Sequence, residues 1–142
     1  KGAENIGELT SLESLELALW RGEFSSSLFK GVSSLKKLRK LVLIGHQEAT
    51  CDTEALSHLE KLKLEELALA WIPQFDDQGL KRISQLQHLQ SLHLDGLRLV
   101  TDQGMAYFSG HKPLTHLNIE YSNCFSEEGI IELASWTELA LI

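Results

Sequence analysis

The sequence predicts an α/β repeat protein in which short parallel strands form one layer and helices form the other. First, a motif of Leu, two residues, Leu, one residue and Leu recurs along the 142 residues. Second, its last two leucines have the period-2 spacing of a strand. Third, helix-spaced apolar residues follow most copies. The copies are Leu12-Leu15-Leu17, Leu38-Leu41-Leu43, Leu64-Leu67-Leu69, Leu89-Leu92-Leu94 and, with Ile last, Leu114-Leu117-Ile119.

The repeat length is regular, because the middle leucine stands at 15, 41, 67, 92 and 117. A sixth copy begins at Leu139, and the same period places its middle residue at Ile142. Within the first copy, Leu15 and Leu17 point to one face of a strand and Glu16 points to the other. We expect the leucines to face the core.

The helices are predicted by apolar residues three apart, which we expect to cover the core from the side opposite the strands. These are Phe29-Val32-Leu35, Leu80-Ile83-Leu86, Met105-Phe108 and Ile130-Leu133-Trp136. Small polar residues precede three of the helices, and Asp76, Thr101 and Ser126 are the expected N-caps. The acidic residues after them, which favour the positive helix end, are Asp77, Asp102, Glu127 and Glu128.

Glycines recur at one position of these helices, at Gly79, Gly104 and Gly129, where we expect the helix to approach its neighbour closely. The first two repeats depart from this pattern. In the second, Cys51 stands where Phe75 stands in the third, and it is expected to fill core volume.

One strand and helix cannot bury their own apolar face, so the repeats must stack into one domain spanning 1–142. We count about five full repeats with partial repeats at both ends. Neither end has an obvious polar cap, which predicts either further repeats or a cap outside this sequence, or self-association through the repeat ends.

This repeat resembles the leucine-rich repeat family over nearly the whole chain. The phrase Val100-Thr101-Asp102-Gln103-Gly104-Met105 is similar to the Ile-Thr-Asp-x-Gly-Leu of the cysteine-containing type. That type is common in F-box substrate adaptors of ubiquitin ligases and in bacterial effectors that imitate them. The resemblance implies a right-handed horseshoe segment, with the sheet on the concave face and helices on the convex face, that binds a protein partner on the strand face.

The sequence departs from that type at the third position after the last strand leucine, where Cys or Asn is usual. The residues there are Trp20, His46, Ile72, Leu97 and Ser122. No F-box helices lie within the 142 residues, so a ligase role would reside in a flanking segment.

Composition excludes several classes of function. A net charge of −7 without a basic stripe opposes nucleic-acid binding. Apolar runs are too short to cross a membrane, and no signal peptide is visible. Cys51 and Cys124 do not form the four-Cys caps of extracellular relatives, which favours the cytoplasm, or the host cytosol for a secreted effector.

The residues between the strand leucines should stack into rows across the strand face. This face has an apolar centre and a polar end, which is the composition of a protein interface. The candidate partner-binding residues are Lys40, Val42, Ile44, Glu66, Ala68, Ala70, Trp71, His93, Asp95, His116, Asn118, Glu120 and Tyr121. The alternative is that the apolar members are simply good strand formers and that Trp71 folds over its own turn.

The predicted function is therefore a protein-interaction module, most specifically the substrate-recognition part of an F-box-like adaptor or a pathogen effector. The alternative binding functions are those of a scaffold, an enzyme inhibitor or a purely self-associating segment. We expect no enzyme activity, cofactor, catalytic residue or metal.

One alternative of another class is a metal-dependent hydrolase, because His93, Asp95, His116 and Glu120 lie on adjacent strands. The simpler interpretation is that these are solvent-facing polar residues. A reactive thiol at Cys124 is a further alternative. The remaining histidines fall in turns or at helix ends, where solvation is expected; they are His46, His58, His88 and His111.

Overall fold

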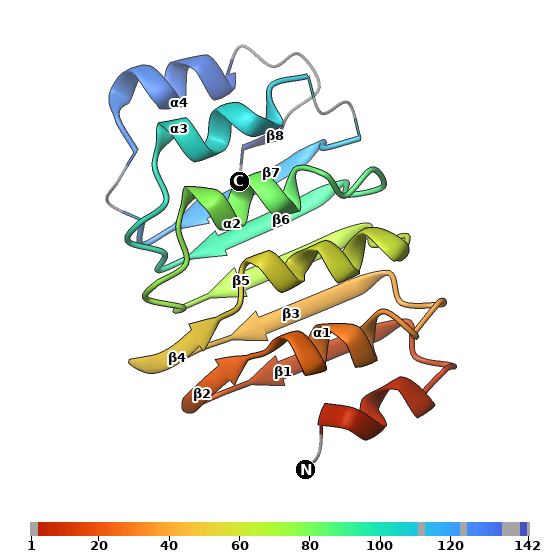
Figure 1. Cartoon of the computed structure of the whole chain (residues 1–142). Coiled ribbons are helices and arrows are strands. Elements are labelled where there is room, and N and C mark those ends of the chain that lie inside the picture. Colours follow the sequence, from red (N-terminus) through yellow and green to blue (C-terminus); the bar gives the residue numbers. More distant parts are fainter. Residues whose placement is uncertain (1–2, 111–112, 123–124, 135–139, 142) are drawn as a thin grey trace.

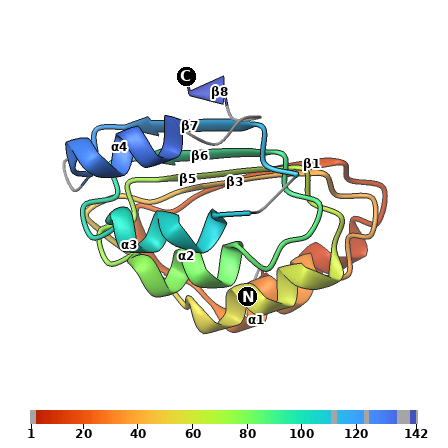
Figure 2. The same cartoon turned by 90° about the horizontal axis from the view of Figure 1, so that it is seen from above.

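The computed structural model describes residues 3–110, 113–122, 125–134 and 140–141. The expectations for His111, Cys124, Trp136 and Leu139 lie outside these residues. The described chain is a mixed α/β structure with a six-stranded parallel sheet, a smaller two-stranded sheet and a layer of helices (Figure 1). Seen from above, the strands form one layer and the helices form the other (Figure 2).

The strands lie where the leucine motifs predict them. They are β1 (Ser14–Ala18), β3 (Lys40–Ile44), β5 (Glu66–Ala70), β6 (Ser91–Asp95), β7 (His116–Glu120) and the short β8 (Ala140–Leu141). All pair in parallel, in the order β1-β3-β5-β6-β7-β8. Leu41, Leu67 and Leu92 are register partners and fully buried, so the predicted core face of the sheet is confirmed.

The last strand differs from the prediction by one residue. Leu117 pairs with Leu141, whereas the repeat length places Ile142 there. Side chains alternate between the faces of a strand, so a slip of one residue exchanges them. Leu141 and Ile142 are both apolar, so either of them could occupy the core-facing position opposite Leu117. The apolar pattern therefore could not decide between them.

The helical layer contains both α-helices and 3-10 helices. They are η1 (Ala3–Glu8), α1 (Ser26–Val32), η2 (Glu54–Lys61), α2 (Asp77–Ile83), α3 (Asp102–Met105) with η3 (Ala106–Phe108), and α4 (Glu127–Ala134). Phe29, Leu80 and Met105 are buried as expected. Ile130 is half exposed, contrary to expectation, since α4 lies beside α3 and no other described helix covers its far side.

The predicted caps are confirmed. Asp76 accepts hydrogen bonds from the N–H groups of Gln78 and Gly79, and Thr101 accepts one from Gln103. The Ser126 hydroxyl accepts one from Gly129. These contacts satisfy N–H groups that have no partner within the helix.

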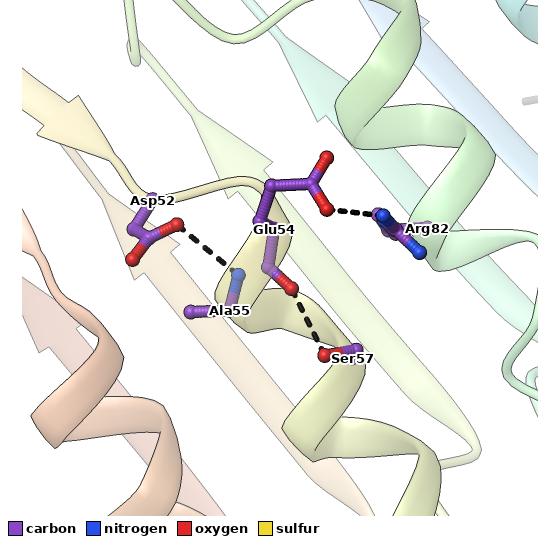
Figure 3. Close-up of polar contacts among 5 residues, drawn as sticks. All are labelled: Asp52, Glu54, Ala55, Ser57 and Arg82. Carbon is purple, nitrogen blue, oxygen red and sulfur yellow. Dashed lines mark hydrogen bonds and ion pairs between the residues drawn. The ribbon is translucent and has the colours of Figure 1, made fainter.

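The second repeat forms a 3-10 helix at its degenerate helix start. Thr53, at the N-cap of η2, makes no side-chain capping bond, and the Ala55 N–H instead donates to Asp52 (3.1 Å). The Glu54 carboxylate pairs with Arg82 of α2, so an exposed ion pair joins the two helices (Figure 3).

A second, two-stranded parallel sheet was not predicted. It joins β2 (Arg21–Phe24) to β4 (Glu48–Cys51), and each of these strands lies in the sequence between the main-sheet strand and the helix of its repeat. Its edge carries an ion pair between Arg21 and Glu48 (3.6 Å). Cys51 packs against the core as expected but is only half-buried. Burial, followed by the charges of Asp52 and Glu23, raises the pKa of its thiol to about 12.

The three equivalent glycines leave space for different neighbours. A Cβ at Gly79 would meet the ring of Phe75 in the same repeat, not a neighbouring helix. A Cβ at Gly104 would overlap the Asp77 carboxylate of the preceding repeat, and one at Gly129 would overlap Asp102. Close approach to a neighbouring repeat is therefore confirmed for Gly104 and Gly129 and wrong for Gly79.

Candidate binding face

We call the side of the main sheet that faces away from the helices the open face. Its residues align in three rows, as the sequence predicts, because the strands pair without a shift in register. The rows are Ser14-Lys40-Glu66-Ser91-His116, Glu16-Val42-Ala68-His93-Asn118 and Ala18-Ile44-Ala70-Asp95-Glu120. The structure thus brings the candidate residues of the four strands β3, β5, β6 and β7 onto one surface.

A shallow groove of about 300 Å³ runs across the middle of the open face. Its centre is lined by Val42, Ile44, Ala68 and Ala70, whose side chains are aliphatic and partly exposed. The polar lining residues are Lys40, Glu66, His93, Asp95, Asn118 and Glu120. Aliphatic side chains between charged margins provide a surface that can bury apolar groups and orient polar ones.

One margin of the groove is a chain of paired charges. The Lys40 ammonium lies 2.8 Å from the Glu66 carboxylate, and His93 Nε2 lies 3.7 Å from the same carboxylate. His93 Nε2 also lies 3.0 Å from the Ser91 hydroxyl. These side chains hold one another in place.

The opposite margin is acidic. Asp95 and Glu120 are register partners on adjacent strands. Asn118 donates a hydrogen bond to Glu120 (2.9 Å), whereas Asp95 Oδ1 is buried and has no hydrogen-bond partner. Burial raises the pKa of Asp95, the charge of Glu120 raises it further, and a hydrogen bond from the Trp71 side chain opposes the rise.

Two aromatic residues follow the strands at this margin. Trp71 and Tyr121 both have left-handed backbone conformations, with φ of 54° and 50°. At the equivalent position in the repeat between them, Gly96 has φ of 62°, and a Cβ there would meet the Trp71 ring. Trp71 therefore lies over the turn of the next repeat, and not over its own turn as the alternative interpretation held.

The two rings form an exposed pair. Their centroids are 5.8 Å apart and the planes are tilted by 33°. Trp71 remains 40% exposed and Tyr121 72% exposed. Large exposed aromatic side chains are frequent anchors in protein interfaces.

A second pocket, of about 520 Å³, lies beside the groove at the ends of the strands and was not predicted. Its lining residues are His46, Gln47, Trp71, Pro73, Gly96 and Arg98. Trp20 stacks on His46 with ring centroids 4.0 Å apart. Both residues occupy the repeat position where the sequence departs from the cysteine-containing type. That departure is the feature of the sequence that could have indicated this pocket.

The structure does not assemble the histidine cluster of the hydrolase alternative. His93 contacts Ser91 and Glu66, and His116 Nδ1 lies 2.9 Å from the Thr115 hydroxyl. In the described ranges, no three His, Cys, Asp or Glu side chains lie close enough to hold a metal ion. The hydrolase alternative therefore has no geometric support here.

The fold and this face define a mixed α/β protein with one helix-covered and one open side of a parallel sheet. No protein-family model matches the sequence, and no curated protein is significantly similar to it. Among the helices described, none is long and apolar enough to span a bilayer.

Proposed function

We propose that the chain is a leucine-rich repeat solenoid segment that binds a protein partner on the open face, which would form the concave side of the horseshoe. The observation that carries this proposal is the groove across β3, β5, β6 and β7, with aliphatic side chains at its centre and charges at both margins. The regular repeats and the in-register rows support the family assignment.

The exposed aromatic pair strengthens the binding proposal. Trp71 and Tyr121 lie beside the groove and expose much of their ring surface. Monomeric proteins rarely leave large apolar surface exposed without a use. We expect these rings to supply much of the binding free energy, since aromatic hot spots commonly contribute about 2 kcal/mol or more.

The more specific proposal is the substrate-recognition part of an F-box-like ubiquitin ligase adaptor, or a pathogen effector acting in host cytosol. It is supported by the similarity of Val100–Met105 to the cysteine-containing type. Ubiquitin transfer to the bound partner, assayed with the full-length protein, separates this role from that of a scaffold or inhibitor.

The experiment is affinity capture from eukaryotic cell lysate with quantitative mass spectrometry, comparing the wild-type chain with Trp71→Ala/Tyr121→Ala. Tyr107→Ala is the matched control, because Tyr107 is 41% exposed on the helical side of the molecule. We expect a protein captured by wild type and control to fall by about tenfold or more with the double variant. Identical capture by all three chains would contradict binding through this face.

A further inference from the structure

We propose that the open face recognises an arginine or lysine side chain of its partner, which lies between the carboxylates of Asp95 and Glu120. This inference rests on the proposed function, because it specifies what the same face binds. Both residues line the groove and face each other across β6 and β7.

The first argument is that the two carboxylates are placed unfavourably for the isolated chain. Adjacent strands lie about 4.8 Å apart, and like charges directly opposite one another destabilise a sheet. Asp95 Oδ1 is also buried without a hydrogen-bond donor in the part of the chain that the structure describes. A buried acceptor left unpaired costs free energy, and a cation bound beside the two carboxylates would offset their charge.

The second argument is that the basic groups lining the groove are engaged elsewhere. Lys40 pairs with Glu66 at the opposite margin, and His93, in the row next to Asp95, contacts Ser91 and Glu66. Asp95 and Glu120 lie one row beyond His93 and two rows beyond Lys40. The acidic margin therefore presents negative charge to a bound partner.

The third argument concerns the surroundings of the carboxylates. Tyr121 follows Glu120 directly, and the Trp71 ring lies against Gly96, the residue that follows Asp95. Aromatic rings attract cations that approach their faces. The aliphatic residues Ile44 and Ala70, in the same row as the carboxylates, offer contacts to the methylene stem of a long basic side chain. Charge, ring faces and apolar centre together favour arginine or lysine.

The test is selection of random linear peptides on the immobilised wild-type chain, followed by affinity measurements with charge-neutralised variants. Asp95→Asn/Glu120→Gln removes the two carboxylates while keeping side-chain shape. Glu8→Gln/Glu60→Gln is the matched control, because it removes the same charge from exposed positions in η1 and η2. It separates specific recognition from general attraction of basic peptides to an acidic protein.

We expect the selected peptides to be enriched in Arg or Lys relative to the starting library. Their Kd should weaken by about tenfold or more with Asp95→Asn/Glu120→Gln and stay within about twofold of wild type with the control. Glu120→Gln alone, at an exposed position, gives the same comparison if the double variant does not fold.

The remaining outcomes separate the two proposals. Peptides that lose affinity with Trp71→Ala/Tyr121→Ala but not with Asp95→Asn/Glu120→Gln, and that show no excess of basic residues, would overturn the inference and leave the proposed function standing. Peptides that bind all variants equally, or a selection that enriches none, would count against both.

Discussion

Asp77, in the first turn of α2, accepts two hydrogen bonds from Thr101, the residue that caps α3 in the next repeat. The Thr101 N–H lies 2.7 Å from Asp77 Oδ1, and its hydroxyl lies 2.6 Å from Oδ2. Asp102 accepts the equivalent bonds from Ser126. Each acidic residue therefore links its own helix start to the next, and the caps are coupled between repeats.

We predict that Asp77→Ala lowers the free energy of unfolding by about 1–3 kcal/mol, because it leaves the partly buried Thr101 N–H and hydroxyl without an acceptor. The measurement is urea unfolding followed by circular dichroism. Arg82→Gln is the comparison: it removes a link between η2 and α2 that is largely exposed, so it should cost less than about 1 kcal/mol (Figure 3). Equal losses for the two variants would contradict this account.

Gly104→Ala should destabilise the chain because its Cβ would overlap the Asp77 carboxylate. Overpacking of this kind typically costs about 1–3 kcal/mol. The two positions share one space, so the costs of Gly104→Ala and Asp77→Ala should not add in the double variant. A double-mutant cycle should give a coupling of about 0.5 kcal/mol or more. Additive losses would show that the glycine is needed for another reason.

The stability of the chain should depend on pH through Asp95. Its pKa is raised above the ordinary value of 3.8 in the folded state, so the folded state holds this proton over a pH range in which the unfolded chain has released it. The contribution of Asp95 to the free energy of unfolding therefore decreases as pH rises through that range. Asp95→Asn, which does not titrate, should gain stability relative to wild type as pH rises from 3.8. A difference that stays constant or shrinks with rising pH would oppose this.

Cys51 should react slowly with iodoacetamide in the folded chain. A pKa of about 12 leaves a thiolate fraction of about one in ten thousand at pH 8, and the thiolate is the reactive form. Mass spectrometry of the Cys51 peptide should show little alkylation in buffer and rapid alkylation in urea. Similar rates in both conditions would mean that burial does not protect this thiol.

Much of the fold could be predicted because the leucine motifs carry two independent signals. Period-2 alternation identifies the strands, and the regular spacing aligns Leu41 with Leu67 and Leu92. The rows of the open face follow from that alignment alone. The N-caps at Asp76 and Thr101 could likewise be predicted from local chemistry.

Features that depend on contacts between repeats could not be predicted in this way. The sequence predicts that Asp77 favours its own helix end, whereas the carboxylate reaches Thr101, 24 residues away. The strand β2, which pairs with β4, could not be predicted because its residues Arg21–Phe24 show almost no alternation between buried and exposed side chains. The position of Trp71 over Gly96 likewise depends on how adjacent turns meet in space.

The most direct test of binding through the open face is photo-cross-linking in eukaryotic cell lysate. A photoreactive benzoylphenylalanine replaces His116, which is exposed on the open face, or Tyr107, which is exposed on the helical side. We predict a covalent adduct with a partner protein from position 116 and none from position 107. Adducts from position 107 alone would place the partner on the helical side and contradict the proposed function.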